Sequence, residues 1–353
     1  MTRLRVTGGA AMVALVLLAG ACSSSSDGNA AASKTTTTTA GSETEKPIAP
    51  ATGKVAEVGT YAVGSHTVTW VDKTRGTNAN GKAPALPTRS FKTLVLYPAQ
   101  GQGTSAGTPV VDAKAKDGPW PLIFFSHGVT GRGSDYALTL QTFASAGYVV
   151  VAPNYPLSNR DAPGGATILD EPNQAKGDVP FLLKETLAAN KASGFLHGLI
   201  DPKEIGLAGH SLGAVTSITA AYDSCCGLPE VKAVAEWAGV LVPLTRPFKL
   251  AESATHLPLL IIHGTKDGTV PYASAARVYA AVGTPKLEVT LPGQNHIPAY
   301  VIGEGSAPGK VVVGATLAFF DAELKGDAAG LSRVKDVVKT AGPSVATLRE
   351  DLG

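Results

Sequence analysis

The chain has 353 residues, enough for one large α/β domain or two smaller ones. Hydrophobic residues make up 44% of it and charged residues only 16%, which excludes a wholly disordered chain. The 30 basic and 28 acidic residues nearly cancel, so a nucleic-acid-binding protein with a basic face is not expected.

The first 21 residues have the three parts of an export signal. Arg3 and Arg5 precede an uncharged apolar stretch, which ends in small residues just before Cys22. Only 16 residues separate Arg5 from Cys22, and a membrane-spanning helix needs about 20. We therefore expect a signal peptide over residues 1–21 rather than a permanent membrane helix.

Two processing routes are open at Cys22. Residues 18–22 resemble the lipobox of bacterial lipoproteins, in which the cysteine is lipidated, although Leu18 lies one position further from the cysteine than usual. The Ala19-x-Ala21 pattern also suits plain secretory cleavage. Residues 22–54 are rich in Ser, Thr and Ala and predict a disordered tether. We expect a lipid anchor on Cys22 at the extracellular face of the cell membrane, with secretion as the alternative.

From residue 55 the chain alternates between predicted strands and helices. Residues 61–71 and 90–97 predict an antiparallel pair. Apolar runs that suit strands buried on both faces follow at 122–125, 148–152, 205–208, 231–235, 257–262 and 287–291. Helical patterns occur at 134–146, 178–192, 212–222, 273–282 and 311–324. This alternation predicts a parallel sheet wound by helices in one domain over residues 55–335, with a weakly patterned tail at 336–353.

Cys225 and Cys226 are adjacent. Neighbouring Cα atoms lie about 3.8 Å apart, below the usual disulfide range of about 4.4–6.8 Å, so a bond between the two would be strained. Export permits oxidation, and a vicinal disulfide and two packed thiols remain equally open. No further ligands follow at zinc spacing, so a metal site is not expected.

The pattern Gly-x-Ser-x-Gly occurs twice, at 103–107 and at 209–213. The first copy lies in a loop with no strand before it, which favours simple turn composition. The second follows a predicted strand and opens a predicted helix, as a nucleophile elbow requires, with Ser211 in a strained backbone conformation. The alternative is a serine that caps the helix. The N–H of Leu212 would face negative charge developing on a substrate oxygen.

A nucleophilic serine needs a base, and the chain has seven histidines. His296 follows the last predicted strand at the carboxyl edge of the sheet, where open α/β sheets hold their sites. Asp267 ends the preceding strand and would hold the imidazole in one tautomer. Glu236 is the alternative acid, and a solvated turn aspartate is the alternative interpretation of Asp267. Packing or turn roles suffice for four other histidines: His66, His197, His256 and His263.

Two loops complete the predicted site. After the first parallel strand, Gly128 lets the backbone turn so that the Val129 N–H can face the serine as a second oxyanion donor; an ordinary glycine turn is the alternative. Residues 154–177 are long and irregular, and either shape a substrate pocket or form a solvated surface loop. Trp237 either lines that pocket or packs in the core.

Four motifs in order carry a resemblance: Phe125-Ser126-His127-Gly128, Gly209-His210-Ser211-Leu212-Gly213, His263-Gly264-x-x-Asp267 and Asn295-His296. Together they resemble those of the α/β-hydrolase superfamily. Within it the chain is similar to dienelactone-hydrolase-like, platelet-activating-factor-acetylhydrolase-like and chlorophyllase-like serine esterases over about residues 61–325. The resemblance implies an α/β-hydrolase fold, with a mostly parallel eight-stranded sheet and helices on both faces.

The same resemblance implies roles for single residues. Ser211 would be the nucleophile, His296 the general base and then acid, and Asp267 its orienting partner, with Val129 and Leu212 as backbone oxyanion donors. Leu212 stands where polyester hydrolases usually carry Met or a glycine-rich run, and dienelactone hydrolases proper use a cysteine in place of Ser211. Plastic and dienelactone substrates are therefore not indicated.

These observations predict a serine hydrolase that cleaves carboxylic esters of small molecules or lipids through an acyl-enzyme, without metal or cofactor. A thioesterase or peptidase on the same fold is one alternative. A catalytically idle envelope protein that binds ligands on a hydrolase scaffold is another.

Overall fold

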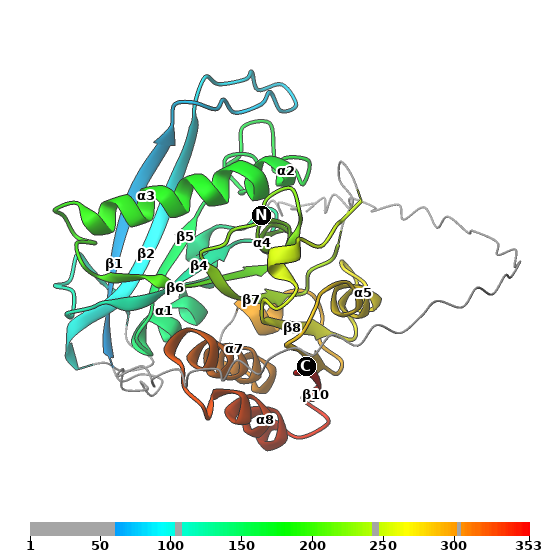
Figure 1. The fold of residues 1–353 in the computed structure, drawn as a ribbon. Helices are drawn as coiled ribbons and strands as arrows, with labels where there is room; N and C mark the ends of the chain where they lie inside the picture. Colours follow the sequence, from blue (N-terminus) through cyan, green and yellow to red (C-terminus); the bar gives the residue numbers. More distant parts are fainter. Residues whose placement is uncertain (1–60, 103–107, 242–246, 302–304) are drawn as a thin grey trace, which may run out of the picture. The chain divides into compact units, whose positions relative to one another are not determined.

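The chain divides into two units, Met1–Ile48 and Ala49–Gly353. The computed structural model describes residues 61–102, 108–241, 247–301 and 305–353, all in the second unit (Figure 1). The predicted signal peptide, Cys22 and the tether lie outside the described residues, as does the first Gly-x-Ser-x-Gly pattern at 103–107.

A ten-stranded sheet forms the centre of the described part, in the order β10-β9-β8-β7-β6-β4-β5-β2-β1-β3. The strands are β1 (Tyr61–Asp72), β2 (Arg89–Gln102), β3 (Val110–Val111), β4 (Trp120–Ser126), β5 (Val149–Pro153), β6 (Ile200–His210), β7 (Val231–Trp237), β8 (Leu259–Gly264), β9 (Lys286–Leu291) and β10 (Thr347–Asp351). Strands β4 to β9 pair in parallel. β2 joins them antiparallel through β5, and β1 pairs antiparallel with β2.

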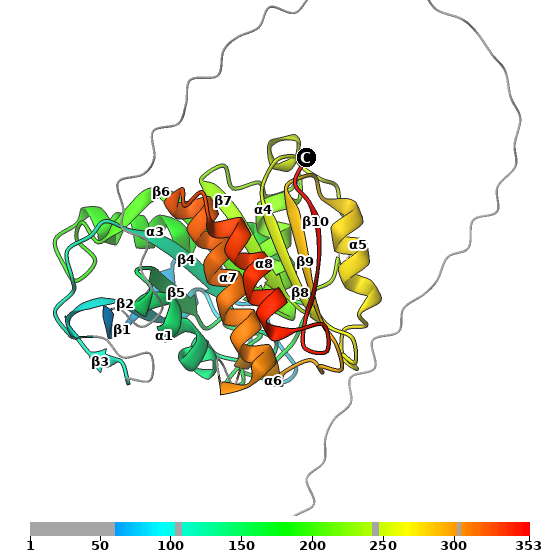
Figure 2. The same cartoon turned by 90° about the horizontal axis from the view of Figure 1, so that it is seen from below.

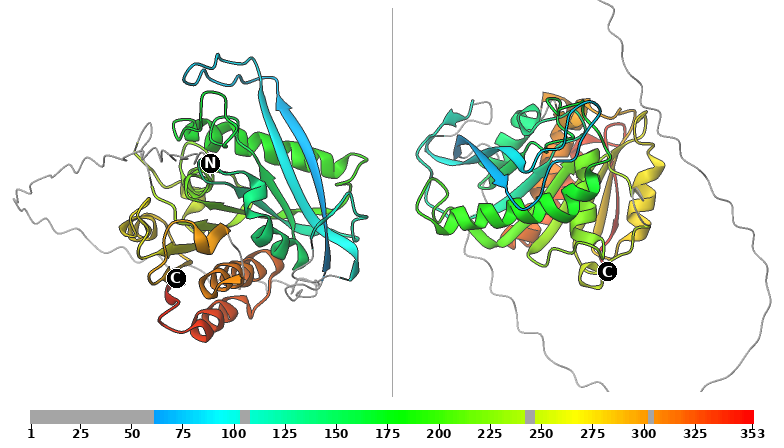
Figure 3. Two further views of the ribbon diagram at one scale, coloured as in Figure 1. Left: turned by 180° about the vertical axis from the view of Figure 1, so that it is seen from behind. Right: turned by 90° about the horizontal axis from the view of Figure 1, so that it is seen from above.

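Helices cover both faces of this sheet. They are η1 (Gly133–Tyr136), α1 (Ala137–Ser145), α2 (Glu171–Asn173), η2 (Gln174–Asp178), α3 (Val179–Lys191), α4 (Leu212–Tyr222), η3 (Glu252–Ala254), α5 (Ala273–Ala281), α6 (Pro298–Val301), α7 (Ala307–Lys325) and α8 (Gly330–Ala341). Side chains of α1, α6, α7 and α8 share one hydrophobic core, on the face that Figure 2 shows. Those of α3, α4 and α5 share the other core, and Figure 3 shows α3 in green and α5 in yellow.

The central strands contain apolar runs because side chains on each face of the sheet contribute to a different core. In β4, Leu122 and Phe124 pack in the core of α3, α4 and α5, whereas Ile123 and Phe125 pack in the core of α1 and α7. A strand covered on both sides loses the alternation of polar and apolar residues. The predicted antiparallel pair, the parallel strands and the helices between them are confirmed.

Two expectations need correction. The described sheet has ten strands rather than eight, and residues 336–353 are part of the domain instead of a separate tail. Val334 and Val338 of α8 are buried against α7 at helical spacing, a signal that the sequence did contain. In contrast, four of the five β10 residues are exposed, so this strand carries no hydrophobic alternation that would predict it.

Residues 154–177 are partly exposed, around positions 160–165, and partly buried, with a buried ion network at their C-terminal end. The guanidinium of Arg89 donates to Asp170 at 2.7 Å and to Asp178 at 2.6 and 2.9 Å. Arg75 donates to Asp178 at 2.7 Å. Arg89 of β2 thereby contacts this segment through Asp170 and contacts the residue just after it through Asp178.

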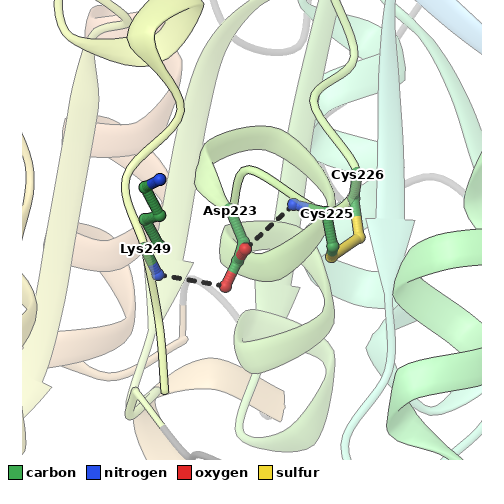
Figure 4. The surroundings of a disulfide bond; sticks show 4 residues. All are labelled: Asp223, Cys225, Cys226 and Lys249. Atoms are coloured by element: carbon green, nitrogen blue, oxygen red, sulfur yellow. Dashed lines mark hydrogen bonds between the residues drawn. A yellow bond between two sulfur atoms is a disulfide. The ribbon is translucent and has the colours of Figure 1, made fainter. Parts of the chain in front are cut away.

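Cys225 and Cys226 form a vicinal disulfide just after α4 (Figure 4). Of the two alternatives that the sequence left open, a disulfide or two packed thiols, the structure has the disulfide. The Asp223 carboxylate accepts from the Cys225 N–H at 3.0 Å, and the Ser224 N–H donates to the Lys249 carbonyl at 2.8 Å. The turn that carries the disulfide is thereby joined to the segment that follows residue 246.

The corrected boundary predicts that residues 336–353 stabilise the domain. Deleting them removes the end of α8, with buried Val338, and the strand that covers the edge of β9. We expect the free energy of unfolding to fall by about 3 kcal/mol or more, measured by urea denaturation. Deletion of the exposed residues 352 and 353 alone is the control and should change little; equal stability of both truncated chains would contradict this assignment.

Candidate functional site

Ser211 lies in a sharp turn between β6 and α4 with φ 57° and ψ −121°. Positive φ is unfavourable for a residue with a side chain, and such strain typically costs about 1–3 kcal/mol. The flanking glycines make the turn possible. A Cβ on Gly213 would lie 2.0 Å from the Ser126 carbonyl oxygen, and one on Gly209 would lie 2.3 Å from the Gly213 carbonyl oxygen. The sequence therefore needs glycine at both positions to bring the helix against β4.

Three polar side chains from different loops meet at this turn. The His296 ring, which follows β9, lies with Nε2 2.8 Å from the Ser211 Oγ. Its Nδ1 lies 2.6 Å from Oδ2 of Asp267, which follows β8. Because an ionised carboxylate only accepts hydrogen bonds, Nδ1 donates to Asp267 and Nε2 is free to accept the serine proton.

Asp267 is held in its charged form by its neighbours. Its Oδ1 accepts from the N–H groups of Thr269 and Val270 at 2.9 and 2.8 Å. Burial alone would raise the pKa of Asp267, but hydrogen bonds from His263, His296 and Val270 outweigh it and hold the pKa well below its usual range. The alternative of a solvated turn aspartate does not fit this buried position.

His263 does more than the packing role that the sequence suggested. Its Nε2 lies 3.0 Å from the Val270 carbonyl and 3.4 Å from Oδ2 of Asp267. It therefore supports the turn that presents Asp267. The spacing of four residues between His263 and Asp267 was visible in the sequence, but their contact depends on how the turn closes.

The loop after β4 packs directly against the serine. A Cβ on Gly128 would lie 3.2 Å from the Ser211 Cβ. The Gly128 carbonyl accepts from His127 Nδ1 at 2.7 Å and from the Gly131 N–H at 2.9 Å. In a planar trans peptide the N–H of the next residue points opposite to this carbonyl, so the two donors also fix the direction of the Val129 N–H.

Neither of the expected oxyanion donors has a hydrogen-bond acceptor among the described residues. No hydrogen bond within the described part of the chain engages the Val129 N–H. Leu212 is the first residue of α4, so its N–H has no acceptor inside that helix. Burial lowers the pKa of His127 to about 4, so the ring that holds the Gly128 carbonyl stays neutral above that pH.

Glu236 and Trp237 are both fully buried, and neither takes part in the hydrogen bonds among Ser211, His296 and Asp267. Glu236 is fully buried on β7, where its Oε2 accepts from the Gly239 N–H at 2.7 Å, and His296 bonds Asp267 instead. Burial raises the pKa of Glu236 to about 7. Trp237 is fully buried and donates to Thr316 at 3.2 Å, so it packs in the core and lines no pocket.

The described residues contain no cluster of three or more His, Cys, Asp or Glu side chains arranged to hold a metal ion. Nor do their helices include one with the length and apolar character needed to cross a bilayer.

Comparisons with known proteins give one family and several relatives. The sequence model of the chlorophyllase family matches residues 94–234, which is less than half of the chain. Two curated proteins, each named "Uncharacterized protein YfhR", come from Salmonella typhi and Salmonella typhimurium. They are 25% and 24% identical over 127 residues, a match that covers 29% of this chain and 43% of each relative.

Among solved structures, a ferulic acid esterase from Streptomyces cinnamoneus is similar with a TM-score of 0.56 and 20% identity. The similarity covers 79% of this chain and 92% of that one. Identity this low shows a shared fold and nothing finer. The predicted resemblance to chlorophyllase-like proteins is confirmed over the matched segment. The chain therefore has the α/β-hydrolase fold, and its chlorophyllase and esterase likenesses support an ester hydrolase.

Proposed function

We propose that the chain is a serine hydrolase that cleaves carboxylic esters through an acyl-enzyme. The observation that carries this proposal is the continuous hydrogen-bonded series from Ser211 through His296 to Asp267, at 2.8 and 2.6 Å, beside a serine with positive φ. A serine that merely capped a helix would need neither the strained turn nor the imidazole.

The geometry supports the following acylation step. The Ser211 Oγ attacks the ester carbonyl carbon while its proton moves to Nε2 of His296. Asp267 stays ionised and stabilises the imidazolium that forms. The carbonyl oxygen becomes an oxyanion that accepts from the N–H groups of Val129 and Leu212. The intermediate then collapses, and His296 gives its proton to the leaving alcohol.

Deacylation repeats this sequence with water. His296 takes a proton from a water molecule as that water attacks the acyl carbon, and the carboxylic acid leaves as the proton returns to Ser211. The ester class rests on the names of the similar proteins, chlorophyllase and ferulic acid esterase. Thioester and amide hydrolysis use the same groups, so comparison of p-nitrophenyl, thioester and peptide substrates decides between them.

Replacing the serine tests the proposal directly. Ser211→Ala should abolish labelling by a fluorophosphonate and reduce hydrolysis of short p-nitrophenyl esters by at least about 10⁴-fold, because the nucleophile is gone. Ser105→Ala in the other Gly-x-Ser-x-Gly pattern is the matched control and should label like the unmodified chain. A folded unmodified chain that neither labels nor hydrolyses esters would instead favour the ligand-binding alternative.

The two candidate acids are separated by a second pair of variants. Asp267→Asn should lower kcat by about 10⁴-fold, because the amide no longer holds the His296 tautomer and cation. Glu236→Gln should leave kcat within about threefold, since the amide oxygen still accepts from Gly239. The reverse order of effects would assign the acid to Glu236.

Glu236→Gln has a further expected effect on stability. Because burial raises the pKa of Glu236 to about 7, the folded chain keeps a proton that the unfolded chain loses above about pH 4.5. The contribution of Glu236 to stability is therefore complete below pH 4.5 and is lost as the pH rises to 7. Relative to Glu236→Gln, the unmodified chain should lose up to about 3 kcal/mol between pH 5 and pH 8 in urea denaturation. Exposed Glu252→Gln should show no such difference.

We also propose that the protein is exported and anchored through Cys22. Residues 1–21 have the composition of a signal peptide, and residues 22–54 have that of a flexible tether. Mass spectrometry of the envelope-purified protein should find Cys22 as a lipidated first residue. A mature chain with an unmodified Cys22 would support plain secretion instead.

A further inference from the structure

The residue before the serine, His210, takes part in a buried series of hydrogen bonds. Its Nε2 donates to the carbonyl of His296 at 2.7 Å. Its Nδ1 lies 2.8 Å from the Tyr136 hydroxyl, and that hydroxyl accepts from the Gly128 N–H at 3.2 Å. The series therefore joins the loop that carries the Val129 N–H to the backbone of the proposed base.

The direction of each hydrogen bond in this series is fixed. The His296 carbonyl can only accept, so His210 carries its proton on Nε2. The Gly128 N–H can only donate, so the Tyr136 hydroxyl accepts from it and donates its own proton to Nδ1. Burial lowers the pKa of His210 to about 3, so the ring stays neutral and adds no positive charge beside His296.

The rings of the series are also packed on both sides. Tyr136 lies 4.7 Å from Phe125 between ring centroids. His210 lies 4.9 Å from His296 and 4.9 Å from Tyr300. Packing alone could place these rings, so only the loss of a hydroxyl or a nitrogen, with the bulk retained, distinguishes the hydrogen bonds from the packing.

We propose that Tyr136 and His210 are positioning residues. They would hold the loop that contains Gly128 and Val129 at a fixed position relative to the loop that contains His296. The inference rests on the proposed function, because this relative position matters only if Val129 and His296 act on one substrate. Neither side chain hydrogen-bonds to the Ser211 Oγ or to the His296 ring nitrogens, although the His210 ring packs against the His296 ring. Their hydrogen bonds act on the backbone of Gly128 and of His296, and so set where the oxyanion donor and the imidazole lie relative to Ser211.

Tyr136→Phe tests the first link. It keeps the ring but leaves the Gly128 N–H and His210 Nδ1 without their partner. Because displacement of a catalytic group by about 1 Å costs up to about 100-fold in rate, we expect kcat for a short p-nitrophenyl ester to fall about 10- to 100-fold. KM should stay within about threefold, since ground-state binding does not depend on the oxyanion donors.

Tyr222→Phe is the matched control. Its hydroxyl is equally buried and donates to the Leu257 and Pro258 carbonyls at the far end of α4. We expect both variants to lower the midpoint of thermal unfolding, but only Tyr136→Phe to lower kcat. A fall in kcat in both variants, in proportion to their loss of stability, would reduce the role of Tyr136 to packing.

His210→Gln tests the second link and is available if Tyr136→Phe does not fold. A glutamine amide can still donate to the His296 carbonyl through its N–H groups, but its one acceptor, the amide oxygen, lies on a flexible side chain and is not fixed at the Nδ1 position. We expect it to lower kcat like Tyr136→Phe. The double variant should be no slower than Tyr136→Phe alone, because both changes break the same series. Effects that multiply would show independent packing defects and overturn the proposal.

The unmodified chain and the two variants give different results if the proposed function fails and if only the positioning roles fail. An unmodified chain that neither hydrolyses esters nor reacts with a fluorophosphonate overturns the proposed function and the positioning roles together. An active unmodified chain with an unchanged kcat in Tyr136→Phe and in His210→Gln overturns the positioning roles alone.

Discussion

The close approach of α4 to the end of β4 is the constraint on which the site depends. Gly213 lies so near the Ser126 carbonyl that even a methyl group would collide with it. This contact lets the first turn of α4 lie beside the loop that contains Gly128, as the proposed pairing of the Leu212 and Val129 N–H groups requires. The positive φ of Ser211 lies between two glycines that pack closely against their neighbours, an environment that can maintain such strain.

Around this turn the structure separates charged groups from neutral ones. Asp267 is the anion of the site, stabilised by backbone N–H groups and by two histidines. His127 and His210 are buried and neutral, and each binds a backbone carbonyl. When both nitrogens of a buried neutral imidazole are hydrogen-bonded, the ring holds its partner groups in a fixed orientation and adds no charge. The neutral histidines can therefore shape the backbone without competing with the Asp267–His296 pair.

Sequence alone predicted the elements whose local signal agrees with their environment. The buried strands are continuous apolar runs, and Ser211, Asp267 and His296 each follow such a run at the carboxyl edge of the sheet. Their meeting could be anticipated because parallel strands end at one edge. β10 could not be found, because its side chains face solvent and its stability comes from pairing with β9.

The contacts of His210 were equally hidden from the sequence. It occupies an unspecified position of the Gly-x-Ser-x-Gly pattern, and its partners are 74 and 86 residues away along the chain. Spacing within a motif says nothing about such distant partners. The long loop at 154–177 shows the same limit, since Asp170 near its end pairs with Arg89, 81 residues earlier in the chain.

The vicinal disulfide limits which disulfides the third cysteine, Cys22, can form. There are three cysteines, and because Cys225 and Cys226 are bonded to each other, neither is left to pair with Cys22. In an oxidising compartment a Cys22 that is retained without an acyl group could form a disulfide only with another molecule. Lipid attachment would therefore also prevent cross-linking between copies of the protein.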